Sequence, residues 1–238
     1  PVTKTNNIDD PGTYHFYFGD QQSTPGTILT FFPWPGARRG TIGTGQASVT
    51  SFAVPQGSLP FWIARAKAQE IPWQGPVVRF ETELITLADP DGLRVELVAS
   101  ALTSETVWEG AGIPAEHAIR GFHSVTLSEQ GFERTAELLT TTMGFRAGRE
   151  DGNRFRFETG EGGFGSVIDL LCLPAGQRGR QGGGSVHQLA WRTPDGAQQQ
   201  EWPSKLAAAG PDVTPGTDAQ DFLQLYLPHP RGVLSEIA

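Results

Sequence analysis

The sequence is short of cysteine, methionine and long apolar runs. It holds one cysteine and one methionine in 238 residues, and a lone cysteine excludes an intramolecular disulfide framework and a cysteine-based zinc cluster. No apolar stretch approaches the roughly 20 residues that span a bilayer, and neither a glycosylation acceptor nor a signal peptide is found. We therefore expect a cytoplasmic protein without a membrane partner.

Positive charge is also scarce. The chain has 26 acidic against 18 basic side chains, a formal net charge of −8, and no basic run, which argues against nucleic acid or an anionic membrane as its partner. Glycine and proline are abundant, with 30 and 18 residues, whereas only 18% of the residues are charged. This composition predicts many short strands and turns rather than a helical bundle.

The chain repeats itself at a spacing of 139 residues. Residues 37–46 align with residues 176–185, and Phe16 and Phe18 fall on two further phenylalanines. The coinciding pairs are Arg39 and Arg178, Gly40 and Gly179, Gly43 and Gly182, Gly45 and Gly184, Phe16 and Phe155, and Phe18 and Phe157. Near the end of each copy the spacing becomes 140, because Glu96 falls on Glu236.

The repeat predicts two tandem domains, at residues 1–100 and 121–238, joined by a linker at residues 101–120. This linker is polar and punctuated by glycine and proline. Each domain divides again into a strand, a helix and further strands, so we expect an α+β protein of four such modules. The second copy opens with a strand and a helix over residues 121–143 that the first lacks, and the first module is therefore predicted to be truncated.

Three stretches carry a family resemblance. They are DDPGTYHFYFGD at residues 9–20, PGTILTFFPWPG at residues 25–36 and PAEHAIRGFH at residues 114–123. With the four modules, they resemble the vicinal-oxygen-chelate superfamily of glyoxalases, bleomycin-resistance proteins and extradiol dioxygenases. Within it, they are similar to bacterial ring-cleaving dioxygenases that act on hydroquinones.

The resemblance implies a fold and a chemistry. Each domain would consist of paired βαβββ modules that form a cupped mixed sheet. One mononuclear Fe(II), or in some members Mn(II), would be held by two histidines and one glutamate, with open positions for a small dihydroxylated ring and for O₂ as co-substrate. A homodimer is the expected assembly.

Only some of the family's metal ligands have a counterpart in this sequence. The carboxylate ligand matches Glu236, whereas the histidine expected from the strand 186–191 is replaced by Gln188, whose carboxamide is a weaker donor than imidazole. His187 is the neighbouring candidate, as a ligand or as a catalytic group, although a regular strand points it to the opposite face and only a bulge would exchange the two. The other histidine ligand would precede Pro1.

The resemblance places Tyr226 beside the substrate, donating a hydrogen bond to a ring hydroxyl or to bound oxygen. Trp191 and His123 are further candidates for substrate binding, with a structural role as the alternative for His123. The family's substrate-side arginine falls at Ala219. Ordinary structural roles stay open at this point: a solvated carboxylate for Glu236, a sheet histidine for His187 and a strand aromatic for Tyr226.

Two functions from different classes follow. The first is an Fe(II)-dependent dioxygenase that cleaves hydroquinone-like or catechol-like rings, impaired or not by Gln188 and Ala219. The second is an altered or non-enzymatic relative that binds an aromatic ligand, which these two residues and the missing first strand favour. A glyoxalase-like isomerase or lyase with a different metal is a third, because glutamine ligands occur there.

Overall fold

The structure is a computed structural model of the chain. It describes residues 2–6, 12–20, 22, 24, 27–104, 107–108, 110–193 and 196–209, together with the backbone of four short strands between residues 218 and 237. Within this described part, no helix is long and apolar enough to cross a membrane.

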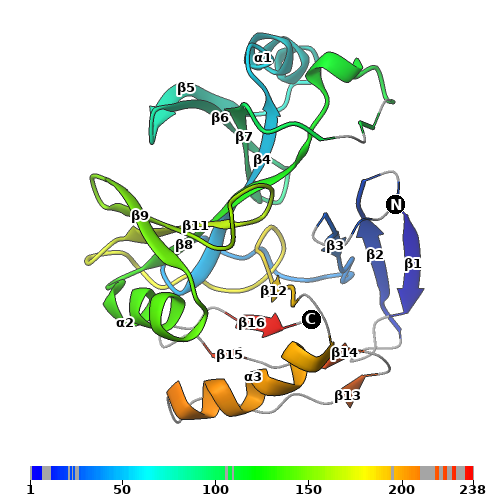
Figure 1. Cartoon of the computed structure of the whole chain (residues 1–238). Coiled ribbons are helices and arrows are strands. Elements are labelled where there is room, and N and C mark those ends of the chain that lie inside the picture. The colour runs from blue at the N-terminus through cyan, green and yellow to red at the C-terminus, as the bar shows by residue number, and fades with distance from the viewer. Residues whose placement is uncertain are drawn as a thin grey trace.

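An eight-stranded mixed sheet forms the centre of the molecule (Figure 1), with strand order β5-β6-β7-β4-β8-β11-β10-β9. One half contains β4 (Gln46–Pro55), α1 (Leu59–Ala68), β5 (Trp73–Arg79), β6 (Thr82–Ala88) and β7 (Arg94–Ser100). The other half contains β8 (Gly121–Glu129), α2 (Glu133–Glu137) with a π-helical turn (Leu138–Thr142), β9 (Arg146–Asp151), β10 (Arg154–Glu158) and β11 (Val167–Cys172). Both halves are βαβββ modules, as predicted, and they join through the antiparallel pair β4–β8.

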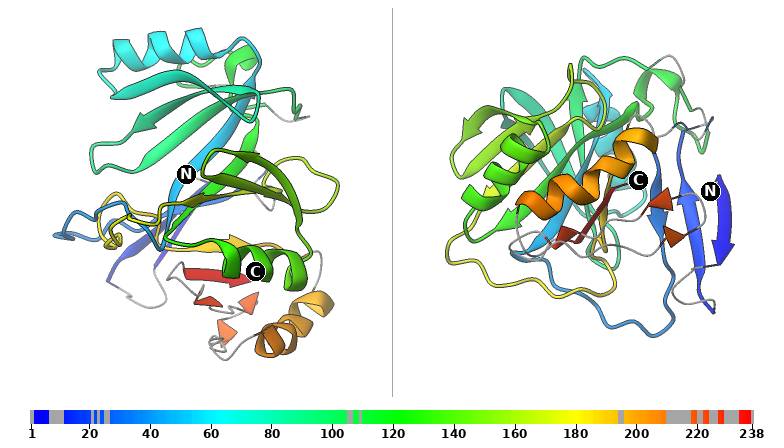
Figure 2. Two further views of the ribbon diagram at one scale, coloured as in Figure 1. Left: turned by 90° about the vertical axis from the view of Figure 1, so that its left-hand side faces the viewer. Right: turned by 60° about the horizontal axis from the view of Figure 1, so that its bottom comes forward.

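Strand alternation gives this sheet two different faces. The outer face is apolar and packs under the helices, so that Leu97 and Ile85 contact α1 residues and Leu170 and Phe157 lie in the cluster that includes Leu139. Figure 2 shows α1 lying along β5–β7 and α2 along β9–β11. The inner face is polar, and its residues are described with the site below.

Two three-stranded half-sheets accompany the central sheet. The N-terminal half-sheet, β1-β2-β3, contains β1 (Thr3–Asn6), β2 (Tyr14–Phe18) and β3 (Leu29–Phe31). The C-terminal half-sheet, β12-β16-β15, contains β12 (Leu189–Trp191), β16 (Leu234–Ile237) and β15 (Leu227–Pro228). The remaining elements are α3 (Gly196–Ala209), the pair β13 (Asp218–Ala219) and β14 (Phe222–Leu223), and a short 3₁₀ turn at Ala115–His117.

Strand registers confirm the internal repeat. Phe16 pairs with Phe31 between β2 and β3, and their counterparts 139 residues later, Phe155 and Leu170, pair between β10 and β11. In the same way Ala190 pairs with Glu236 between β12 and β16, as Ser51 pairs with Glu96 between β4 and β7. The repeat spacing therefore relates the N-terminal half-sheet to the half of the central sheet that contains β10 and β11, and the C-terminal half-sheet to the half that contains β4 and β7.

The modules combine in an order that the sequence did not predict. The central sheet joins the module at residues 46–100 to the module at residues 121–172, across the stretch 101–120 that we expected to be a linker. Repeat spacing identifies equivalent modules, but it does not say which of them share a sheet. The domain division at residues 101–120 stays a prediction.

The two glycine-rich repeat loops bind each other across an approximate twofold axis. Thr41 N–H donates to Arg180 O and Arg180 N–H donates to Thr41 O, both at 2.9 Å. Around this centre, Gly40 N–H donates to Gly183 O, and the counterpart bond runs from Gly179 N–H to Thr44 O. The glycines that coincide in the repeat thus form the contact surface between the two loops.

Close backbone approach explains why these positions are glycine. A Cβ added at Gly43 would overlap the backbone of Gln177 and Gly179, whereas one added at Gly183 would meet nothing nearer than 3.9 Å. We expect Gly43→Ala to destabilise the protein by about 1–3 kcal/mol, because the loops cannot part without breaking their ladder. Gly183→Ala, the matched control, should stay within about 0.5 kcal/mol of the wild type. Chemical denaturation of both variants measures this, and equal effects would contradict the docking of the loops.

Candidate functional site

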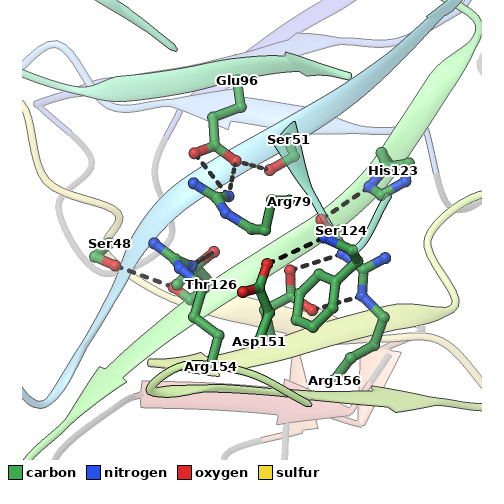
Figure 3. Close-up of polar contacts among 12 residues, drawn as sticks. Ser48, Ser51, Arg79, Glu96, His123, Ser124, Thr126, Asp151, Arg154 and Arg156 are labelled. Atoms are coloured by element: carbon green, nitrogen blue, oxygen red, sulfur yellow. Dashed lines mark hydrogen bonds and ion pairs between the residues drawn. The ribbon is translucent and has the colours of Figure 1, made fainter. Parts of the chain in front are cut away.

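The inner face of the central sheet holds two buried ion pairs (Figure 3). On one module, Arg79 Nη1 donates to both carboxylate oxygens of Glu96, at 3.0 and 2.9 Å, and Ser51 Oγ donates to Glu96 Oε2 at 2.9 Å. The Glu96 side chain is 3% exposed and that of Arg79 is 15% exposed. Burying a carboxylate this deeply is costly unless its charge is paired, and Arg79 supplies the cation here.

The second ion pair lies on the other module, between β10 and β11. Arg156 donates through Nε and Nη2 to the two oxygens of Asp169, at 2.8 and 2.9 Å, in a bidentate pair. The guanidinium of Arg156 also lies 4.1 Å from the ring centre of Phe80. Phe80 stands in the β5–β6 turn with a left-handed backbone, and its N–H donates to Asp151 across the sheet. The turn therefore ties the two modules together over the ion pairs.

His123 lies on this same inner face. Its Nδ1 is 3.0 Å from Ser124 Oγ, and burial, followed by the nearby positive charge of Arg156, lowers the pKa of His123 to about 4. A cavity of about 10 Å³ remains among these side chains, which is room for about one water molecule. The inner face of the central sheet is thus filled by its own charges and does not admit an aromatic ring.

The other predicted site residues belong to the C-terminal half-sheet or its approach. Gln188 is partly buried just before β12, and by alternation it lies on the same face as Ala190, the register partner of Glu236. The strand β16 that carries Glu236 is described, but its side chains are not. Tyr226 lies outside the described residues. The structure thus places Gln188 and Glu236 on one face, and these assignments stay predictions.

His187 and Trp191 make other contacts. The exposed ring of His187 meets Phe32 and Trp34 edge-on, at centroid distances of 6.0 and 5.8 Å. Trp191 packs into the core cluster against Phe145, at 5.7 Å. Neither contact brings His187 or Trp191 to the face that carries Gln188. His123 lies on the central sheet, apart from these residues.

Comparison of the two carboxylates reveals a difference in their surroundings. The two groups that bind Glu96 are Arg79 and Ser51. By the repeat, Ala219 stands at the place of Arg79, since Ala219 pairs with Phe222 as Arg79 pairs with Thr82. Ala190 stands at the place of Ser51. The position of Glu236 therefore lacks both of the side chains that satisfy Glu96.

This difference bears on whether a metal fits. By register, positions 236 and 188 belong to one face of the C-terminal half-sheet, and a carboxylate and a carboxamide are oxygen donors that suit a divalent cation. The ring of His187 contacts Phe32 and Trp34 instead, and the described residues include no group of three histidine, cysteine or acidic side chains that could hold a metal. The fit is therefore partial, because only two residue types at these positions agree with a metal site.

Sequence reasoning missed three charged residues of the central sheet, Arg79, Arg154 and Arg156. It also missed an aromatic cluster beside β12, in which His15 stacks on Phe32 at 4.1 Å and Phe32 stacks on Trp34 at 5.1 Å. The repeat could have linked these two groups of residues, because His15 and Tyr17 coincide with Arg154 and Arg156 at the spacing of 139.

Comparison with known proteins gives the family. The chain is 40% identical over 237 residues to MhqO of Bacillus subtilis (strain 168), which is named as a ring-cleaving dioxygenase. This match covers 100% of the chain and 75% of the relative. It is 29% identical over 231 residues to a chlorohydroquinone/hydroquinone 1,2-dioxygenase of Sphingobium indicum, covering 94% of this chain and 71% of that protein. No family model matches the chain.

Solved structures agree with the fold. A crystal structure of a dioxygenase from Bacillus subtilis, 40% identical, matches with a TM-score of 0.92 over 100% of this chain and 76% of that one. Glyoxalase I from Zea mays, 16% identical, matches with a TM-score of 0.72 over 99% of this chain and 82% of its own, which shows the fold alone. With these relatives the chain belongs to the ring-cleaving dioxygenases, and its repeated βαβββ modules and mixed curved sheet share the fold of glyoxalase I.

Proposed function

We propose that the protein opens hydroquinone-like rings with O₂ at a single Fe(II) site held by Glu236 and Gln188. One observation carries the proposal. Glu96 is neutralised by Arg79, whereas the counterpart glutamate, Glu236, has Ala219 at that place. A glutamate that has lost its arginine is suited to a metal cation.

The family supports the rest of the proposal. Ring-cleaving dioxygenases use a metal and O₂, and one relative is named for hydroquinone and chlorohydroquinone. The family resemblance implies a histidine as the third ligand. When bound, Fe(II) would supply a coordination site for a ring hydroxyl and for oxygen. Tyr226 would donate a hydrogen bond to the substrate, and Mn(II) is the alternative metal.

The central sheet is the reason why we expect a single metal site per chain. Its inner face carries the other repeated glutamate, but Arg79 and Arg156 supply the positive charge there. Because both carboxylates are already paired, we expect this face to bind no metal. We expect its ion pairs to contribute to stability instead.

Replacing Gln188 tests the assignment of the metal ligands. We expect Gln188→His in the full-length protein to raise Fe(II) affinity by about tenfold or more, because imidazole is a stronger donor than a carboxamide. Anaerobic Fe(II) titration measures the affinity. Gln200→His, on the exposed face of α3, is the matched control and should leave it unchanged. An unchanged affinity in Gln188→His would show that residue 188 does not bind the metal.

An altered relative that binds aromatics without oxygen chemistry is the second candidate. Gln188 and Ala219 favour it, because one weakens the metal site and the other removes a cation that could stabilise an oxygenated intermediate. Oxygen uptake with hydroquinone or a chlorinated hydroquinone separates the two. The dioxygenase predicts uptake that depends on Fe(II), and the altered relative predicts ring binding without uptake.

The location and the assembly stay predictions. The composition favours a cytoplasmic protein without nucleic acid or membrane as partners, and the family resemblance favours a small aromatic substrate. The homodimer rests on the family resemblance. Light scattering of the purified full-length protein would test that assembly.

A further inference from the structure

The N-terminal half-sheet carries an unusual pair of polar side chains on one face of β2. Tyr17 Oη lies 2.8 Å from His15 Nδ1. Both rings are partly buried and lie 4.1 Å apart. Tyr14 and Phe18 lie on the opposite face of the strand and are 49% and 41% exposed. The His15–Tyr17 pair is therefore set apart from the apolar face of its own strand.

The repeat shows which way this polar face points. His15 and Tyr17 are the counterparts of Arg154 and Arg156, and the registers agree, because Tyr17 pairs with Thr30 as Arg156 pairs with Asp169. Arg156 lines the inner cavity of the central sheet together with Glu96. Since Glu236 is the counterpart of Glu96, the His15–Tyr17 pair belongs to the same inner face as the proposed metal ligand.

Aromatic side chains connect the polar pair with the approach to β12, where His187 lies on the face opposite to Gln188. Phe32 stacks on His15 and also meets the ring of His187, the residue that precedes Gln188. Trp34 stacks on Phe32 and is 40% exposed. The polar pair is thus bordered by flat aromatic side chains that reach toward β12. Such a wall suits a planar aromatic ligand.

The hydrogen-bonding capacity of the pair is only partly used. Burial lowers the pKa of His15, so its imidazole is neutral at pH 7 and has one donor and one acceptor nitrogen. When Tyr17 donates its hydroxyl hydrogen to Nδ1, the lone pairs of the phenol oxygen are left to accept a hydrogen bond. His15 Nε2 then carries the other hydrogen, and it is buried without a hydrogen-bond partner among the described residues.

We propose that the His15–Tyr17 pair binds the ring hydroxyl of the substrate that does not coordinate the metal. This inference deepens the proposed function and rests on it for the identity of the substrate class, a ring with two hydroxyl groups. Tyr17 accepts the hydrogen of that hydroxyl, and His15 holds Tyr17 in the accepting orientation. The pair thereby distinguishes dihydroxylated rings from rings with one hydroxyl. At the positions that Arg154 and Arg156 occupy in the central sheet, the N-terminal half-sheet thus carries the uncharged pair of His15 and Tyr17.

The test compares two ligands on two variants of the full-length protein. Dissociation constants of hydroquinone and of phenol are measured anaerobically after Fe(II) loading, for the wild type, for Tyr17→Phe and for Tyr14→Phe. We expect Tyr17→Phe to weaken hydroquinone binding by about tenfold and phenol binding by less than about twofold, because only hydroquinone loses a hydrogen bond. Tyr14→Phe, on the opposite face of β2, should change neither.

The outcomes separate this inference from the proposed function. Equal weakening of both ligands, or of neither, by Tyr17→Phe would overturn the role of the pair even where the wild type binds Fe(II) and consumes oxygen. Selective loss of hydroquinone affinity in a protein that binds no Fe(II) would uphold the pair and overturn the proposed metal site. A wild type that binds neither ligand overturns both. The iron content of Tyr17→Phe should equal that of the wild type, since Tyr17 is no ligand.

Discussion

Arg79→Met is expected to destabilise the protein by about 3–5 kcal/mol. The substitution leaves the carboxylate of Glu96, which is 3% exposed, without its cation in the interior of the central sheet. Breaking a buried pair by removing one partner costs this much, because the remaining charge is desolvated and unpaired. Urea denaturation followed by circular dichroism measures the loss, which we expect as a fall in the transition midpoint.

Two controls make this result specific. The double variant Arg79→Met with Glu96→Leu removes both charges, and we expect it to recover most of the lost stability, because a buried pair replaced by apolar groups is often close to neutral. Arg149→Met removes an exposed partner of Glu81, with exposures of 61% and 82%, and should cost less than about 1 kcal/mol. A small effect of Arg79→Met, similar to that of Arg149→Met, would contradict the buried ion pair.

Glu236→Ala in the full-length protein is expected to abolish Fe(II)-dependent oxygen uptake. We expect a loss of more than about a hundredfold, because even the groups that only orient metal ligands contribute 10- to 100-fold. Oxygen-electrode measurements with hydroquinone, together with iron analysis of the loaded protein, give the result. The variant should stay folded, since an alanine leaves no unpaired buried charge.

The repeat supplies the control for this experiment. The double variant Arg79→Met with Glu96→Leu removes the counterpart glutamate without stranding its arginine, and it should retain oxygen uptake near the wild-type level. Loss of uptake in both variants would mean that both carboxylates serve the reaction. Retained uptake in Glu236→Ala would show that this glutamate is not a metal ligand.

The internal repeat carried most of the fold prediction. Coincidences such as Phe16 with Phe155 and Glu96 with Glu236 predicted two copies of paired modules, and the strand registers confirm them. The spacing could not predict that residues 46–100 share a sheet with residues 121–172. Equivalence of two segments leaves their packing partners undetermined, because the same modules can pair in either order.

The site was predictable only in part, for a related reason. A family resemblance identified Glu236, but no sequence pattern shows that Arg79 binds its counterpart Glu96. The alignment placed Ala219 opposite Arg79 without indicating that the arginine neutralises a buried carboxylate. The polar pair of His15 and Tyr17 was likewise visible only as alternation in a strand, until the structure showed that its counterparts line a cavity.

The central claim is that one of two related inner faces is neutralised by arginine and the other by a metal. Anaerobic titration of the full-length protein with Fe(II) tests it most directly, by the number of tightly bound equivalents per chain. We predict one equivalent in the wild type, one in the double variant Arg79→Met with Glu96→Leu, and less than a tenth in Glu236→Ala. Two equivalents in the wild type, or one retained in Glu236→Ala, would contradict the claim.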